Sequence, residues 1–220
     1  MIKKIKDLIE QAAGASQDKG PSVVALTPEE AAEMLSALPQ SAEPDMRTIG
    51  LFTEVAEEKN AELIHAMLYL NELNRLQKKD DNKKPIEFYI STYGGSADDM
   101  FGMYDVMRQV REETEIHTIG VGKVMSAGVL ILAAGTKGKR KIGKYCRVMI
   151  HSVIAGSHGS LPNLANEIEA IQGIQEDYID ALVNETDMTK EDIKNMLERK
   201  VNVYLSAEEA VELGIADIII

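Results

Sequence analysis

The chain has 220 residues, enough for one domain or for one domain with an appendage. Its formal net charge of −12 argues against a nucleic-acid-binding protein, because the phosphates of a duplex would repel it. The longest apolar stretch, around residues 124–135, is too short and too rich in glycine to span a bilayer, so no membrane partner is expected. Cys146 is the only cysteine and cannot form a disulfide within the chain, which suits a reducing, cytoplasmic compartment.

Residues 1–46 are expected to be an N-terminal extension of short helices and a linker. Apolar side chains at helical spacing open it, and then glycines and Pro21 interrupt the pattern. A capping box at residues 27–30 predicts a helix to about residue 38, and the linker follows. The first segment, to about residue 20, is interpreted either as a loose tail or as a removable leader or docking segment.

From residue 47 onward, the sequence alternates between predicted strands and helices. Strands are predicted at residues 48–52, 86–90, 116–121, 145–151 and 201–205. Helices are predicted at about residues 54–77, 100–110, 126–135 and 161–185, and a last one after the capping box Ser206–Glu209. This alternation indicates an α/β domain over residues 47–220 with a largely parallel sheet, whose sites form outside the strand ends.

The helix predicted at residues 161–185 is long for a compact domain of this size. At about 1.5 Å per residue it would extend roughly 35–40 Å. We therefore expect part of it to project from the domain and to pack against another subunit. The chain also ends in isoleucines at residues 218–220, an apolar terminus that needs a partner surface or a groove.

A serine and a histidine stand where a nucleophile and its base could meet. Ser126 opens a predicted helix and His151 closes a predicted strand. The N–H of Ala127 is a natural oxyanion donor, because the first N–H groups of a helix are unpaired, and the flexible Gly95 is a natural second donor. Each residue also has an ordinary interpretation: Ser126 as an N-cap, His151 as a strand-end histidine and Gly94-Gly95 as a turn.

Five short blocks, taken in order, are more specific than any of their parts. They are Gly94-Gly95-Ser96, Met125-Ser126-Ala127-Gly128, the run from Ala134 to Arg140, Arg147-Val148-Met149-Ile150-His151 and Leu205-Ser206-Ala207-Glu208-Glu209-Ala210. This string resembles the proteolytic subunit of the ATP-dependent Clp protease, ClpP, of peptidase family S14. The likeness covers about residues 47–220, and its departures fit a divergent, viral-type member.

The resemblance implies the crotonase-like α/β fold of ClpP with a projecting helix-strand handle, in which the helix at residues 161–185 would be the handle helix. It implies a tetradecamer of two stacked heptameric rings that enclose the active sites. The implied activity is that of an ATP-dependent serine endopeptidase acting on unfolded polypeptides, which a hexameric Clp ATPase feeds into the chamber. The ATPase uses the ATP, so neither a cofactor nor a metal is expected in this subunit.

Residue by residue, the match supplies most of a serine-protease site. Ser126 would be the nucleophile and His151 the general base, with Gly95 and Ala127 as the oxyanion-hole donors. The segment at residues 154–160, with Gly156 and Gly159, would pair with the extended substrate as an added strand.

The match also covers an outer hydrophobic pocket that receives a loop of the unfoldase in this family. Its apolar positions are occupied here by Tyr89, Ile119, Val121 and Ile220. Glu87 and Lys141 stand where apolar or aromatic residues are usual, so the pocket is either retuned for a different ATPase or weak. Alternatively, these are ordinary surface residues on the sheet.

The third catalytic position departs from the family pattern, because Asn202 stands where the family has an aspartate. Asparagine can orient the histidine through a hydrogen bond but cannot stabilise the imidazolium by charge. The same replacement in a serine protease of another fold costs about 10⁴ in kcat. We predict a slow or conditional triad of Ser126, His151 and Asn202, with Asp187 as a less favoured substitute.

Two further departures concern loops. Tyr93 stands where proline is usual before the two glycines, which would alter the loop next to the oxyanion hole. The segment between Asp105 and Ser126 is two residues longer than in typical members, and we expect the extra residues in the charged turn at residues 111–115.

Alternatives of the same fold remain open. A viral relative that processes capsid proteins during head maturation fits the departures, although no long scaffold segment follows residue 220. A catalytically weak ring subunit paired with an active homologue fits Asn202. A crotonase-type acyl-CoA enzyme would share the fold but would not need the pairing of Ser126 with His151.

Overall fold

The structure is a computed structural model that describes residues 46–77, 83–198 and 202–220. The chain divides into two units, Met1–Asp45 and Met46–Ile220, and the second is described here by itself. The helix expected at residues 27–38 and the rest of the predicted extension lie outside the described residues.

A mainly parallel sheet forms the centre of the second unit. Its strands are β1 (Thr48–Leu51), β2 (Ile86–Thr92), β3 (Ile116–Met125), β4 (Lys141–Ile142) and β7 (Ile218–Ile219), in the spatial order β1-β2-β3-β4-β7. β5 (Arg147–Ile150) pairs in parallel with the end of β3, and β6 (Val203–Leu205) pairs antiparallel with β5. The predicted α/β class with a largely parallel sheet is confirmed.

β3 is longer than the sequence predicted, because a glycine bulge continues the strand instead of ending it. Ile90 pairs with Gly120 and Thr92 with Val124, so β3 contains two more residues than β2 between these pairs. Gly122 has a φ of 68°, a left-handed conformation that glycine adopts without a steric penalty. The strand therefore reaches Met125, directly before Ser126, and changes partner from β4 to β5 on the way.

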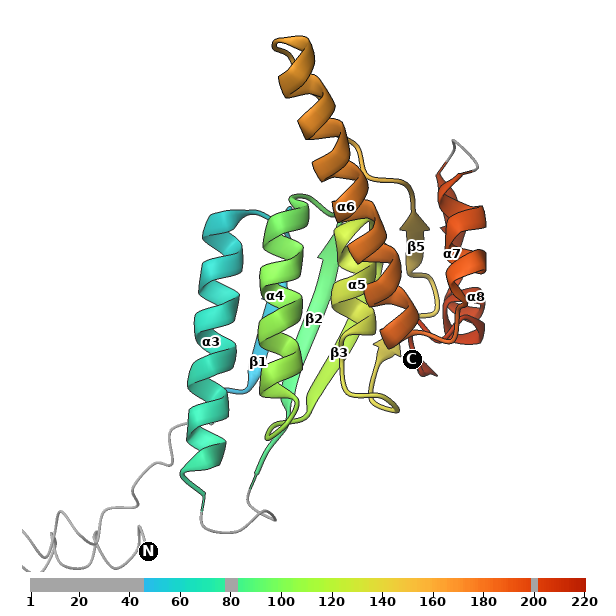
Figure 1. The fold of residues 1–220 in the computed structure, drawn as a ribbon. Helices are drawn as coiled ribbons and strands as arrows, with labels where there is room; N and C mark the ends of the chain where they lie inside the picture. The colour runs from blue at the N-terminus through green and yellow to red at the C-terminus, as the bar shows by residue number, and fades with distance from the viewer. Residues whose placement is uncertain (1–45, 78–82, 199–201) are drawn as a thin grey trace, which may run out of the picture. The chain divides into compact units, whose positions relative to one another are not determined.

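Three helices cover one face of the sheet (Figure 1): α3 (Glu57–Arg75), α4 (Ala97–Val110) and α5 (Ala127–Ala133). They pack on the alternate residues Ile86, Phe88 and Ile90 of β2, all of which are fully buried. Methionines such as Met67, Met103 and Met107 fill this core, as expected for a chain with few aromatic residues. α5 is buried on every side, so its start is held rigidly.

The predicted long helix is present as α6 (Leu161–Glu185), and its first half projects from the domain (Figure 1). Its buried residues all lie between Tyr178 and Glu185, whereas Leu161 is 80% exposed. Residues 151–160, which precede it, contain no strand in the single chain, so only the helical half of the expected handle is formed.

Two short helices complete the unit: α7 (Lys190–Leu197) and α8 (Ala207–Glu212). α8 follows the predicted capping box, and both Ser206 and Glu209 make its hydrogen bonds. α7 was not among the predicted helices. Thr189 and Asp192 form a second capping box, which is a sequence signal for its start.

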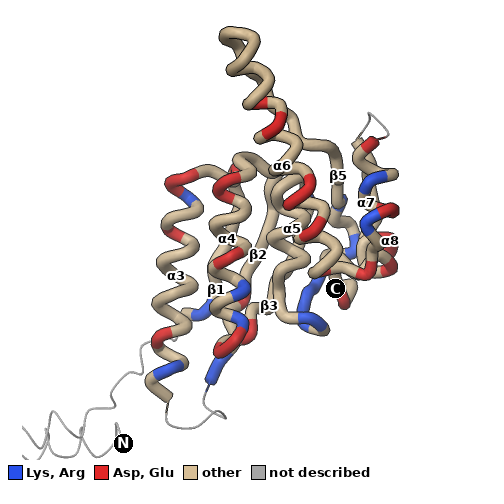
Figure 2. Tube along the Cα trace, viewed as in Figure 1, with Lys and Arg blue, Asp and Glu red and all other residues tan. Residues whose placement is uncertain are grey.

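Figure 2 shows acidic residues along α3, α4 and α6 and basic residues in the loop before β4. One of these, Arg140, is only 4% exposed and forms a two-point ion pair with Asp217, with an Nη2–Oδ1 distance of 2.5 Å. Arg140 Nη1 also donates to the carbonyl oxygen of Glu185 at 2.6 Å.

The isoleucine terminus, which was expected to need a partner surface or a groove, pairs with a strand of its own chain. β7 pairs with β4, and the N–H of Ile220 donates to the carbonyl of Ile142.

The charged turn predicted at residues 111–115 contributes Arg111 to a contact with the end of α6. Arg111 makes a two-point ion pair with Glu185, at 2.7 and 2.9 Å, and Tyr104 donates its hydroxyl hydrogen to the same carboxylate. Burial alone would raise the pKa of Glu185, but the Arg111 guanidinium and the Tyr104 hydroxyl outweigh it and lower the pKa. The end of α6 is therefore anchored to α4.

We expect Asp217→Ala to destabilise the fold by about 3–5 kcal/mol, because the buried Arg140 charge would lose its partner. Burial raises the pKa of Asp217, but the hydrogen bonds and charge of Arg140 outweigh this effect and lower it. The ion pair therefore contributes stability above the unfolded pKa of about 4 and loses it as the pH falls through the lower folded pKa. Urea unfolding across this pH range measures both effects. Glu212→Ala, an exposed change on α8, is the control, and equal stability of the two variants would contradict the prediction.

Candidate active site

Ser126 has a strained backbone at the junction of β3 and α5. Its φ of 54° and ψ of −124° make it the one non-glycine residue with a positive φ in the described part of the chain. Such a conformation costs about 1–3 kcal/mol and persists only where the surroundings impose it. The N–H of Ser126 donates to the carbonyl of Met149 in β5 at 2.8 Å, and its own carbonyl accepts from Val129 at 2.9 Å.

The side chain of Ser126 does not serve the helix. Ser126 occupies the N-cap position of α5, as one interpretation of the sequence expected, but its hydroxyl makes no capping hydrogen bond. Ser96, Thr189 and Ser206 each make one at the start of their helices. The Ser126 hydroxyl is therefore left for another role, at a strained turn that holds it at the end of the sheet.

The loop Gly94-Gly95 packs directly against this turn. A Cβ atom on Gly94 would lie 2.6 Å from Cβ of Ser126, and one on Gly95 would lie 2.1 Å from the carbonyl oxygen of Val55. Val55 donates to the Gly94 carbonyl and accepts from Ser96, so the N–H of Gly95 between them points away from Val55. Ala127 is the first residue of α5, where the N–H has no partner within the helix.

His151 follows the last residue of β5, and its ring is held in one orientation. Nδ1 lies 2.6 Å from the carbonyl oxygen of Ser152. A carbonyl oxygen only accepts hydrogen bonds, so Nδ1 carries the proton and Nε2 keeps its lone pair. This tautomer leaves Nε2 able to accept a proton, as a general base requires.

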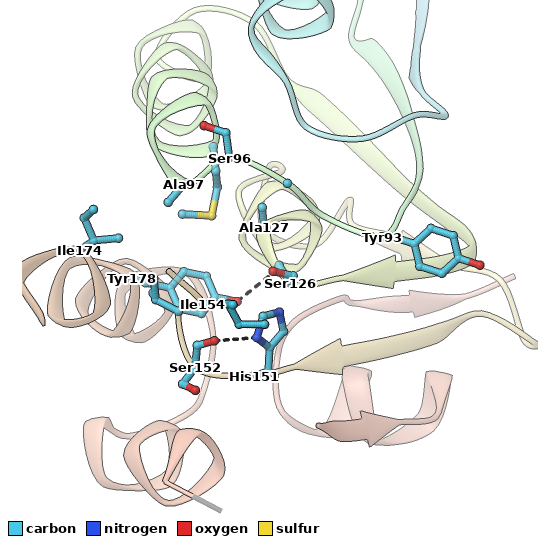
Figure 3. A pocket seen from close by; sticks show the side chains of 13 residues that line it. Tyr93, Ser96, Ala97, Ser126, Ala127, His151, Ser152, Ile154, Ile174 and Tyr178 are labelled. Atoms are coloured by element: carbon cyan, nitrogen blue, oxygen red, sulfur yellow. Dashed lines mark hydrogen bonds between the residues drawn. The ribbon is translucent and has the colours of Figure 1, made fainter. Parts of the chain in front are cut away.

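Ser126 and His151 line the same pocket, which has a volume of about 350 Å³ (Figure 3). No hydrogen bond joins the Ser126 hydroxyl to the His151 ring, although both residues are described. Such a contact often tightens only when substrate binds. Gly95 and Ala127 also line the pocket, so the structure brings together the four residues that the sequence singled out for nucleophile, base and oxyanion donors.

Apolar side chains from several elements form one wall of this pocket. They are Ala97, Met100, Ile154, Ile174 and Tyr178. α4 and α6 contribute most of them, and no aspartate or glutamate lines the pocket. The wall is therefore suited to an apolar side chain next to the Ser126 hydroxyl.

Asn202 lies beside His151 in the sheet register but does not bind it. Val203 pairs with Ile150, so the next pair of the antiparallel ladder would be Asn202 with His151. Asn202 is exposed, and the Nδ1–H group of His151 donates its hydrogen bond to the Ser152 carbonyl instead. Asp187 is elsewhere: its N–H donates to Leu213, and it does not line the pocket.

The residues singled out for substrate pairing and for docking lie outside the pocket. Gly156 and Gly159 are exposed in the segment without a strand. Tyr89 pairs with Ile119 on the sheet face away from α3, and Ile119 is only 2% exposed because its neighbours cover it. Val121 follows on the same face, and Ile220 is 57% exposed at the end of β7.

Two residues of α6 that the sequence did not single out contact the backbone of the site. The buried Tyr178 hydroxyl donates to the carbonyl of Ser126 at 3.3 Å, and burial raises its pKa. Gln175 accepts a hydrogen bond from the N–H of Val153 at 3.3 Å. They are three residues apart and so share one face of the helix. In the sequence both residues lie along the apolar stripe of α6, where a tyrosine is interpreted as an ordinary core residue.

Among the described residues, no group of three or more histidine, cysteine, aspartate or glutamate side chains could hold a metal ion. None of the helices described is long and apolar enough to cross a membrane.

Comparison with known proteins gives matches over most of the chain. The sequence model of the family described as Clp protease matches residues 33–220. The chain is 33% identical over 174 residues to the ATP-dependent Clp protease proteolytic subunit 1 of Prochlorococcus marinus subsp. pastoris, covering 79% of this chain and 83% of that protein. It is 30% identical over 174 residues to the proteolytic subunit 2 of Parasynechococcus marenigrum, again covering 79% and 83%.

We expect Tyr178→Phe to slow the reaction of Ser126 with a fluorophosphonate probe by roughly twofold to tenfold, the effect of one lost hydrogen bond. The Tyr178 hydroxyl holds the Ser126 carbonyl, and the N–H of Ala127 belongs to the same rigid peptide unit. The measurement is the second-order rate of labelling. Tyr104→Phe is the control, because it removes a buried hydroxyl that binds Glu185 outside the pocket. If both variants react at the rate of the unmodified protein, Tyr178 does not position the peptide.

Proposed function

The chain belongs to the Clp protease family, and we propose that it is a serine endopeptidase that cleaves unfolded polypeptides inside a ring-shaped chamber. The observation that carries the serine mechanism is the strained Ser126, whose unused hydroxyl shares a pocket with a histidine in the base tautomer. Proteolysis itself follows from the family, since the matched relatives are proteolytic subunits.

The reaction is acyl transfer in two halves. As substrate brings the two side chains together, His151 Nε2 takes the hydroxyl proton while Ser126 Oγ attacks the peptide carbonyl carbon. The oxygen of the tetrahedral intermediate accepts hydrogen bonds from the N–H groups of Gly95 and Ala127. His151 then returns the proton to the leaving amine, and water hydrolyses the acyl-enzyme with the same base.

The orientation of His151 relies on neutral partners. The Ser152 carbonyl holds Nδ1 in the described state, and Asn202 stands at the neighbouring register position. Neither group carries a charge that would stabilise the imidazolium formed during catalysis. We infer a slow proton transfer, in which Asn202 would act as the third triad residue by accepting the Nδ1 hydrogen bond that the Ser152 carbonyl accepts in the described state.

The substrate is an extended polypeptide. Its acyl half is expected to place an apolar side chain against the wall that includes Met100 and Ile174. Residues 154–160 are exposed and without a strand, so their backbone is free to pair with a substrate strand, with Gly156 and Gly159 allowing close approach.

Assembly completes the proposal. The projecting half of α6 exposes Leu161 and Ile168, and Ile154 before it is 81% exposed, which suits burial against other subunits in two stacked heptameric rings. A hexameric Clp ATPase would dock on the face containing Tyr89, Ile119 and Val121, with Ile220 nearby, and would hydrolyse the ATP itself. The subunit would then need no cofactor and would act in the cytoplasm.

The comparisons favour this function over the alternatives. The matched relatives are named as subunits of an ATP-dependent protease, which does not favour a capsid-processing enzyme or a catalytically weak partner subunit. An acyl-CoA enzyme of crotonase type gives no reason for the strained Ser126.

We expect a fluorophosphonate probe to label the assembled protein at Ser126 and at no other serine. The His151→Ala variant should lose the labelling, because the hydroxyl would have no base, and Ser126→Ala should lose it by removing the target. Peptide mapping by mass spectrometry locates the adduct, and light scattering verifies the ring. An intact ring that does not react would contradict the proposed mechanism.

We expect Asn202→Asp to raise kcat, by up to about 10⁴-fold if the aspartate binds His151 fully, because its charge would stabilise the imidazolium. The measurement is kcat and KM for a fluorogenic peptide. Asn195→Asp, on the exposed surface of α7, adds the same charge outside the pocket and is the control. A complete loss of activity in Asn202→Asp alone would show that Asn202 does not occupy the third position.

A further inference from the structure

Tyr93 lies on the side of Ser126 away from the apolar wall, and a lysine of β3 packs on its ring. Tyr93 lines the pocket from the end of β2 and is 71% exposed (Figure 3). The Nζ atom of Lys123 lies 4.5 Å from the centroid of the Tyr93 ring, a cation–π distance. The ring therefore holds the ammonium group at the margin of the pocket.

A second cation stands next to Lys123. Lys123 of β3 pairs in register with Arg147 of β5, so both side chains leave the sheet on the same face. Neither forms an ion pair with any carboxylate of the described residues, and only a longer-range attraction links Arg147 to Glu208. Like charges in adjacent register positions repel each other. A carboxylate placed between them would relieve this repulsion.

The course of the substrate brings its leaving half to these cations. When the acyl half puts its side chain against the apolar wall, the chain after the scissile bond must continue on the opposite side of Ser126, where Tyr93 lies. Lys123 precedes Ser126 by three residues of extended strand, roughly 10 Å. An extended substrate covers the same distance in about three residues. Glu54 packs against Gly95 but does not line the pocket, so it does not occupy this path.

We propose that Tyr93, Lys123 and Arg147 form a subsite for an acidic side chain within the first three residues after the scissile bond. Tyr93 holds Lys123 toward the cleft, and the two cations bind the carboxylate. This inference rests on the proposed function and adds a substrate preference to it.

The test uses fluorogenic peptides with amidated C-termini that differ only by glutamate or glutamine at the first, second or third position after the cleaved bond. We expect kcat/KM to be roughly threefold to tenfold higher for glutamate at one of these positions, and the preference to shrink at 1 M salt. Lys123→Glu should abolish or reverse it, and Lys123→Met should reduce it. The readout is the ratio of kcat/KM for the glutamate and glutamine peptides within each variant, so a general change in activity does not count as loss of the subsite.

Lys144→Glu is the matched control. Lys144 also lies over an exposed ring, 5.7 Å from the centroid of Tyr145, but neither residue lines the pocket. The preference for glutamate should survive in this variant. A comparable loss in Lys144→Glu would assign the effect to the general field of the protein and overturn the subsite.

Two other outcomes separate this inference from the proposed function. Equal cleavage of the glutamate and glutamine peptides, blocked by Ser126→Ala, would overturn the subsite and leave the protease intact. A preference seen only for peptides with a free C-terminal carboxylate would assign the cations to chain-end recognition, which also overturns a side-chain subsite. No cleavage of any peptide by the assembled protein would instead contradict the proposed function.

Discussion

The strained turn at Ser126 is the feature on which the site depends. A residue with a φ of 54° between a strand and a buried helix is unfavourable alone, and neighbouring elements hold it in place. β5 holds the N–H through the Met149 carbonyl, and α6 holds the carbonyl through Tyr178. Because β5 leads to His151, the bond that stabilises the turn also brings His151, the proposed base, to the pocket that Ser126 lines.

Glycines allow this convergence at two points. Gly122 lets β3 bulge, so that its end leaves β4 and pairs with β5. Gly94 lets the Gly94-Gly95 loop pack against Ser126, where any Cβ atom would collide. Both requirements are backbone effects, and neither depends on the chemistry of a side chain.

The handle helix is tied to the site at one end and anchored at its base. Tyr178 and Gln175 contact the backbone around Ser126 and Val153, and about two turns further along α6, Glu185 binds Arg111 and Tyr104. The same helix exposes apolar residues in its first half, where other subunits would pack. A single helix thus connects the proposed assembly surface to the backbone of Ser126, so assembly could change the position of Ser126 through α6.

Much of this protein can be predicted from local sequence. Apolar patterns predicted β1, β2, β3, β5 and β6, the long α6 and the parallel sheet, because burial periodicity is a local property. The two-residue strands β4 and β7 were not predicted, because they are too short to show a period. The order of the short blocks identified Ser126, His151, Gly95 and Ala127 as one group, and the structure has all four around one pocket. The capping box of α7, Thr189 and Asp192, is likewise a local signal in the sequence.

Contacts between distant segments could not be predicted in this way. The bulge at Gly122, the contact of Tyr178 with Ser126 and the register neighbours Lys123 and Arg147 each join segments that lie far apart in the chain. Local pattern specifies which face a side chain occupies but not which distant residue it meets, because that partner depends on strand register and helix packing. The residues of the site can therefore be predicted from the sequence, whereas their mutual geometry is set by the packing of β3, β5 and α6.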